Sequence, residues 1–192
     1  MKRCAAARAS AKDVKLQIEF NPRVVASYRL IGYENRLLKD HEFNDDRKDA
    51  GDMGAGHSVT ALYELIPAGR PIESASIDPL KYQQPGSLSS AATRDEVMTV
   101  KIRYKQPQGK GSALITVAVA GTTTASPEMG FAAAVAEFGM LLRDSAFKGS
   151  SSFAEALSLA QRFKGDDRHG HRAEFIRLIG AAEGLTRLRA AR

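Results

Sequence analysis

The first half of the chain is a succession of short strand patterns separated by turns, and this limits the possible folds more than any other feature. Apolar residues occupy every second position from Val14 to Phe20, which predicts a strand with one buried and one wet face. The wet face would carry Lys15. We expect strands over residues 13–20, 26–34, 57–66, 96–105 and 112–120. The turn residues between the last two strands predict a hairpin.

The pattern becomes helical after residue 125. Ser126 is suited to cap a first helix, Ser152 a second, and a third is expected from about His171. The first of these helices is expected to stop at Lys148–Gly149. The predicted fold class is therefore α+β, an antiparallel β-sandwich followed by a C-terminal helical appendage of about three helices. The expected organisation is a disordered basic leader, a sandwich and a helical region packed on the sandwich, over residues 1–11, 12–125 and 126–192.

Large aromatic side chains are the reason for expecting that packing. The helices carry five phenylalanines at apolar positions: Phe131, Phe138, Phe153, Phe163 and Phe175. Burying one such ring contributes roughly 1.5–3 kcal/mol, so several unburied rings would offset much of a domain's stability. Because the link between the last strand and the first helix is short, the sandwich is the expected partner surface.

Five segments follow one another in a recognisable order: AKDVKLQIEFNP, YRLIGYENRLL, FNDDRKDAGDMGAGHSVTALYEL, VKIRYK and FAAAVAEFGMLLR. Over residues 11–185 the chain resembles the C-terminal region of bacterial von Willebrand factor type A (VWA) domain-containing proteins. The resemblance implies a module that follows a VWA domain and serves it as a platform for protein–protein contacts. It implies no catalytic residues, because none are established for this module.

The VWA domain itself has no counterpart in the sequence. Its metal site is built on Asp-x-Ser-x-Ser, whose oxygen ligands suit Mg²⁺ or Ca²⁺. The nearest fragments here are Asp144–Ser145 and Ser74–Ser76, and neither completes the motif. We expect no VWA metal site in this chain, and we interpret the leader as lying where a VWA domain would have ended.

Composition narrows the function further. A single cysteine, Cys4, excludes an internal disulfide, and no run approaches the roughly 20 apolar residues that span a bilayer. The absence of such a run argues against a second interpretation of the resemblance, in which the chain is part of a calcium-activated chloride channel-like VWA protein. The net charge of +6 resides largely at the chain's two ends. Basic ends make nucleic-acid or polyanion binding an alternative function, but without tryptophan or interleaved aromatics solvated ends are the simpler interpretation.

Two clusters contain residue types that can bind metal. The acidic loop carries four candidates, Asp45, Asp46, Asp49 and Asp52, yet Arg47 interrupts the calcium-loop pattern and no glutamate closes it. Such residues are also frequent in loops because their side chains bond nearby backbone amides. The second cluster is the pair of imidazoles at positions 169 and 171, beside two aspartates.

His169 and His171 can in principle bind Zn²⁺. The same segment equally suits a helix terminator and cap. A third histidine, His57, is expected to start a strand, with neighbouring glycines supplying positive φ. No nucleophile is paired with a base, so we predict a non-enzymatic module without catalytic residues, metal or cofactor.

A module separated from its partner is expected to expose apolar surface. The resemblance implies that the module contacts a VWA domain and that sequence preceding that domain completes part of its sheet. Removal of both would leave an unpaired strand edge or an apolar patch. We therefore expect a protein partner, with a VWA domain as the implied one, and self-association or limited solubility of the isolated chain.

Overall fold

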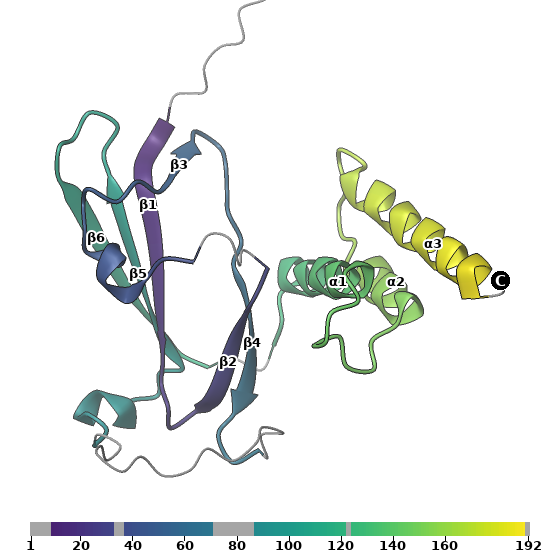
Figure 1. The fold of residues 1–192 in the computed structure, drawn as a ribbon, viewed down its shortest axis with the longest axis horizontal. Helices are drawn as coiled ribbons and strands as arrows, with labels where there is room; N and C mark the ends of the chain where they lie inside the picture. Colours follow the sequence, from purple (N-terminus) through teal and green to yellow (C-terminus); the bar gives the residue numbers. More distant parts are fainter. Residues whose placement is uncertain (1–8, 33–36, 71–86, 122–123, 191–192) are drawn as a thin grey trace, which may run out of the picture. The chain divides into compact units, whose positions relative to one another are not determined.

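The structure is a computed structural model that describes residues 9–32, 37–70, 87–121 and 124–190 (Figure 1). That part of the chain contains six β-strands and three α-helices. The chain divides into two compact units, residues 1–121 and residues 122–192. All of these strands belong to the first unit and all of these α-helices to the second, which confirms the α+β class with helices at the C-terminal end.

The larger sheet has four strands in the order β3–β1–β5–β6, and all neighbours are antiparallel. These strands are β1 (Ala9–Phe20), β3 (Gly51–Gly54), β5 (Met98–Lys105) and β6 (Ser112–Val119). The predicted hairpin is confirmed, since β5 and β6 pair in unbroken register along their whole length. The central pair, β1 with β5, joins segments about eighty residues apart and therefore depends on tertiary packing.

The smaller sheet pairs β2 (Val25–Ile31) with β4 (Leu62–Pro67). Phe20, at the end of β1, connects the two sheets and is buried. Its ring centroid lies 4.5 Å from that of Tyr28 on β2 and 5.5 Å from that of Tyr63 on β4. The antiparallel sandwich is therefore confirmed, with two described strands facing four.

The first strand differs from its prediction in two ways. β1 begins at Ala9, so the end of the predicted leader belongs to the sheet, while residues 1–8 lie outside the described part. The expected alternation of wet and buried positions is also wrong at its start. Lys15 is only 2% exposed, whereas Leu16, predicted to be buried, is 43% exposed.

The loop between β2 and β4 departs further from the prediction. It contains a short 3-10 helix, η2 (Asp40–Phe43), and strand β3, whose four residues include two glycines and show no apolar alternation. The strand predicted from residue 57 begins at Leu62, so His57 does not start it. The positive φ expected at a neighbouring glycine is present at Gly56, where φ is 77°.

The helical unit consists of α1 (Pro127–Leu142), α2 (Phe153–Arg162) and α3 (His171–Ala190). Both predicted caps are confirmed. Ser126 Oγ accepts a hydrogen bond from the Met129 amide at 3.1 Å, and Ser152 Oγ accepts one from the Glu155 amide at 3.2 Å. The predicted stop of α1 at Lys148–Gly149 is six residues late, because the chain leaves the helix at Arg143–Asp144, where Asp144 has a φ of 49°.

The core of the helical unit combines small residues with aromatic rings. Its fully buried residues are Ala134, Ala156, Ala160 and Ile179. The Phe138 ring centroid lies 6.1 Å from that of Phe153 and 5.4 Å from that of Phe175. Gly130 lets α1 approach α2, since a Cβ there would lie 2.4 Å from the Phe163 ring. These rings have partners within their own unit and do not need the sandwich to bury them. Packing of the helical unit on the sandwich stays a prediction.

Candidate functional site

The acidic loop is held over the larger sheet by a buried lysine. Lys15 Nζ donates hydrogen bonds to the backbone carbonyls of Glu42 at 3.1 Å and Asp45 at 2.5 Å. Backbone carbonyls thus replace the water that an ammonium group loses on burial. Lys15 thus fixes the loop to β1 through main-chain carbonyls of the loop and not through its acidic side chains.

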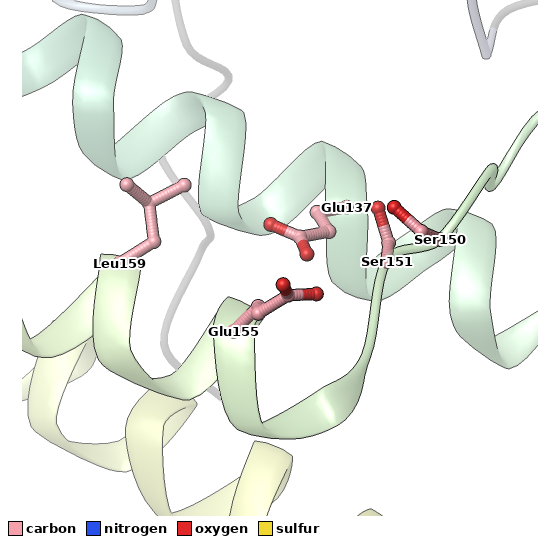
Figure 2. Close-up of a pocket in the computed structure, with 5 residues that line it drawn as sticks. All are labelled: Glu137, Ser150, Ser151, Glu155 and Leu159. Carbon is pink, nitrogen blue, oxygen red and sulfur yellow. The ribbon is translucent and has the colours of Figure 1, made fainter.

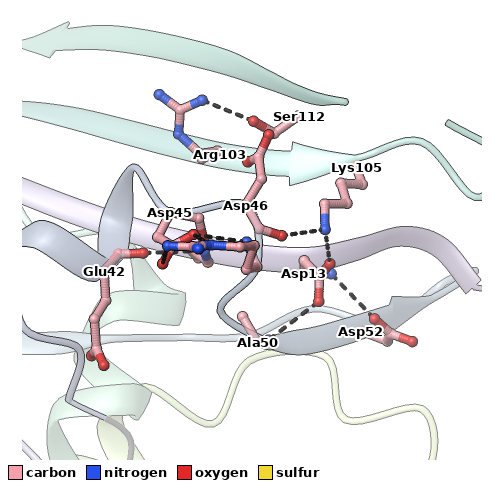
Figure 3. Close-up of polar contacts among 11 residues, drawn as sticks. Asp13, Glu42, Asp45, Asp46, Ala50, Asp52, Arg103, Lys105 and Ser112 are labelled. Atoms are coloured by element: carbon pink, nitrogen blue, oxygen red, sulfur yellow. Dashed lines mark hydrogen bonds and ion pairs between the residues drawn. The ribbon is translucent and has the colours of Figure 1, made fainter. Parts of the chain in front are cut away.

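A second lysine joins β5 to the same loop and to β1 (Figure 3). Lys105 Nζ lies 2.6 Å from Asp13 Oδ2 and donates to the Asp46 carbonyl at 2.8 Å. Asp13 also accepts a hydrogen bond from the Ala50 amide, and its own amide donates to Asp52 Oδ1, each at 3.2 Å. Asp13 sits at an irregularity in the β1–β5 register with a φ of 49°, a backbone conformation that aspartate tolerates better than most residues.

Arg103 supplies the third basic contact. Its guanidinium donates to Asn44 Oδ1 at 2.9 Å and to Ser112 Oγ at 2.8 Å. It also lies over the buried Phe43 ring, 5.5 Å from the centroid. Among the residues that the structure describes, Arg103 Nε is the one buried side-chain nitrogen or oxygen without a hydrogen-bond partner.

The four aspartates that the loop sequence suggested as metal ligands do not act as one group in the structure. Hydrogen bonds from Arg47 lower the pKa of Asp45 to about 2, and Ser112 lowers the pKa of Asp46. Asp49 is exposed, and Asp52 accepts the hydrogen bond from β1. Within the described ranges, no three His, Cys, Asp or Glu side chains are placed to hold a metal ion together. The geometry supports a loop in which Asp45, Asp46 and Asp52 make separate local contacts.

Acid is expected to weaken the contact between Asp13 and Lys105. The hydrogen bond from Lys105 lowers the pKa of Asp13 below its ordinary value of 3.8. A lowered pKa in the folded state adds stability above the ordinary value, and this stability is lost as the pH falls through the lowered pKa. Asp13→Asn should therefore be less stable than the unmodified chain at about pH 6, and the difference should shrink as the pH falls below 3.8 and through the lowered pKa of Asp13.

Urea unfolding at about pH 6 and at a series of lower pH values measures this difference. Asparagine also tolerates a positive φ, so the substitution leaves the backbone of β1 unstrained. Asp95→Asn, at an exposed position before β5, is the matched control and should show no such pH-dependent difference. A gap between Asp13→Asn and the unmodified chain that persists in acid would show that the ion pair is not its cause.

The histidine cluster is organised as a helix start. Asp167 accepts hydrogen bonds from the Arg172 amide at 3.1 Å and the Ala173 amide at 2.7 Å, which confirms the predicted cap. Asp166 pairs with Arg168 at 3.0 Å. The rings of His169 and His171 have centroids 5.9 Å apart. Both aspartates of this cluster therefore already have partners in the turn.

Sequence reasoning missed a pocket in the helical unit (Figure 2). It has a volume of about 370 Å³ and is lined by Glu137, Ser150, Ser151, Glu155 and Leu159. Burial raises the pKa of Glu137, and the charge of Glu155 adds to the shift. Glu155 also completes the cap of α2, since Ser152 Oγ donates to its carboxylate at 3.0 Å. The pocket offers hydrogen-bond acceptors but no histidine or cysteine. A glutamate beside the apolar Phe138 was its only sequence signal.

The basic ends, which suggested polyanion binding, are only partly described. Lys2, Arg3, Arg8 and Arg192 lie outside the described residues. On α3, Arg187 is paired with Glu183 at 2.6 Å. None of the helices that the structure describes combines the length with the apolar composition that a bilayer crossing requires.

The facing surfaces of the two sheets remain open over part of their area. Leu16, Ile102 and Ile115 form one row across β1, β5 and β6, on the same face as Phe20. Ile115 and Val117 on this face are 45% and 48% exposed. On the opposing sheet, the paired residues Tyr28 and Leu65 are 57% and 36% exposed.

We call this set the open core face: Leu16, Tyr28, Leu65, Ile115 and Val117. Each member occupies a position that a complete sandwich buries between its sheets. The apolar surface expected from the sequence is thus present, on the facing sides of the two sheets.

Comparison with known proteins places the chain in a family. It matches, over residues 6–185, the family model described as "Uncharacterized protein YfbK, C-terminal". The chain belongs to the YfbK C-terminal family. One relative, the "Uncharacterized protein YfbK" of Escherichia coli (strain K12), is 48% identical over 177 residues, which make up 92% of this chain. The chain spans 30% of the length of that relative. No solved structure matches this chain. The expected resemblance is confirmed at this level: the chain corresponds to a C-terminal module of a larger protein.

Proposed function

We propose that this YfbK C-terminal module is a non-enzymatic platform that binds another protein through its open core face. The observation that carries the proposal is the exposure of core positions on both sheets, such as Ile115 and Tyr28. Leu16 and Ile115 flank Ile102 in one row of the larger sheet, and exposed apolar surface of this kind marks interaction sites on folded proteins. Covering a half-exposed side chain of this size contributes about 1 kcal/mol, so the five together favour binding by several kcal/mol before the cost of association.

The polar groups of the sheet unit support a structural role over catalysis. The residues that would be candidates for acid–base chemistry, Asp13 and Asp45, are ion-paired with Lys105 and Arg47. Their lowered pKa values make them poor proton donors near neutral pH. The loop functions as a fixed cover for one end of the larger sheet.

The proposed partner is a VWA domain in the remainder of the longer protein. Two observations support it: the resemblance of the chain to modules that follow a VWA domain, and the 30% coverage of the E. coli relative, which leaves most of that protein outside the match. A domain within the same polypeptide is held at high effective concentration, so a surface of modest size is sufficient.

The test uses this chain and the part of the E. coli relative outside the matched region, produced separately. Isothermal titration calorimetry should detect binding. Ile115→Lys should abolish it, because a charge would be buried without a partner. Val59→Lys is the matched control, since Val59 is 66% exposed but lies between β3 and β4, outside both sheets. It should bind as the unmodified chain does.

Circular dichroism establishes that both variants are folded. No binding by the unmodified chain at concentrations up to about the millimolar range, or an equal loss in the two variants, would contradict the proposal.

A further inference from the structure

β6 is the outermost strand of the larger sheet, and no strand that the structure describes pairs with its outer side. Natural edge strands are protected by charges, proline or bulges, which prevent them from pairing with other chains. β6 has none of these features: its sequence SALITVAV is uncharged, and its register with β5 is unbroken. It is also exposed on both faces, with Leu114 at 49% on one and Ile115 at 45% on the other.

We infer that β6 accepts an extended strand from the longer family protein, outside the C-terminal region, which continues the larger sheet. The added strand pairs with the backbone groups on the outer side of β6, and its side chains cover Ile115 and Val117. This inference rests on the proposed function and specifies how the partner binds. It makes the sandwich a shared structure, with this chain supplying part of it and the preceding polypeptide the rest.

The sheet defines the chemistry of the missing strand. Neighbouring strands lie about 4.8 Å apart, so its side chains contact those of β6 directly. On the face of Ile115 it must be apolar at alternate positions. On the other face, Leu114 and Thr116 share rows with Arg103 and Lys101 of β5. Uncharged or acidic residues suit that side, and basic residues are disfavoured.

A tethered strand fits these features better than a second copy of the chain. One strand pair of eight residues is marginal in water, because its hydrogen bonds barely offset the ordering of the chain. A tether within one polypeptide raises the effective concentration to about the millimolar range, which compensates for weak pairing. Two copies have no such advantage, and the net charge of +6 on each opposes their approach.

Amide hydrogen exchange of this chain, alone and with the unmatched part of the E. coli relative, tests the inference. Strand pairing should slow exchange at alternate amides of β6, on the order of tenfold or more, because every second N–H points to the added strand. The opposite edge strand, β3 (Gly51–Gly54), is the internal control and should exchange at an unchanged rate.

The possible results are distinguishable. Binding without protection at β6 would overturn strand pairing and leave the proposed function standing, whereas absence of binding at about millimolar concentrations of the two parts, the level that the tether supplies, would contradict both. Protection already present in the isolated chain would also overturn the inference. Light scattering then identifies the occupant: a dimer indicates a second copy, and a monomer indicates a segment of this chain itself.

Discussion

Replacing Ile179 with alanine is expected to lower the free energy of unfolding of the helical unit by about 2–5 kcal/mol. Ile179 is the largest fully buried side chain among the described residues and packs with three buried alanines. Alanines at Ala134, Ala156 and Ala160 cannot extend into the space that isoleucine leaves, so a cavity remains. Thermal unfolding followed by the helical circular dichroism signal measures the effect.

The adjacent residue provides the control. Leu178 is 56% exposed on the same helix, and Leu178→Ala should change stability by no more than about 0.5 kcal/mol. Equal effects of the two substitutions would contradict the assignment of the core. Strand signals recorded in the same experiment test the predicted packing of the helices on the sandwich. If the units are packed together, Ile179→Ala lowers both transitions; a shift of the helical transition alone would contradict that packing.

The helices were predictable because their determinants are local. Ser126 and Ser152 cap helices through bonds to residues three positions later, so the sequence contains both partners of each contact. The end of α1 was less predictable. A turn at Asp144 requires a positive φ in a residue other than glycine, and no sequence signal announces it.

The hairpin of the larger sheet was predictable, but which side chains of β1 are buried was not. Alternation placed Lys15 on a wet face, which assumes that nothing covers that face. The acidic loop covers it, with partners twenty-seven and thirty residues away whose contributing atoms are backbone carbonyls. Backbone carbonyls are the same in every residue, so sequence patterns contain no information on this contact.

An exposed apolar interaction surface was predictable, but the residues that form it were not. The resemblance to modules with a VWA domain implied exposed apolar surface, yet Leu16 and Ile115 read as ordinary core positions of alternating strands. Their exposure depends on how many strands face them. In the part of the chain that the structure describes, β2 and β4 form a separate two-stranded sheet opposite four strands, and Leu16 and Ile115 stay exposed.

Replacing Lys15 with methionine is expected to destabilise the sheet unit by about 2–4 kcal/mol. Methionine has a similar length and keeps the apolar stem, but it donates no hydrogen bond. The carbonyls of Glu42 and Asp45 would each lose a charged donor, a contact worth about 1.5–3 kcal/mol, while relief from burying an ammonium group offsets part of the loss. Urea unfolding measures the change.

Lys101→Met is the matched control for this lysine. Lys101 lies on the same sheet, and its partner is the exposed carboxylate of Glu19 at 3.4 Å, so its loss should cost no more than about 0.5 kcal/mol. Limited proteolysis adds a local measurement: the loop that follows η2 should be cleaved faster in Lys15→Met, because its attachment to β1 is removed. If Lys15→Met were as stable as Lys101→Met and the loop equally resistant, the buried lysine would not hold the loop in place.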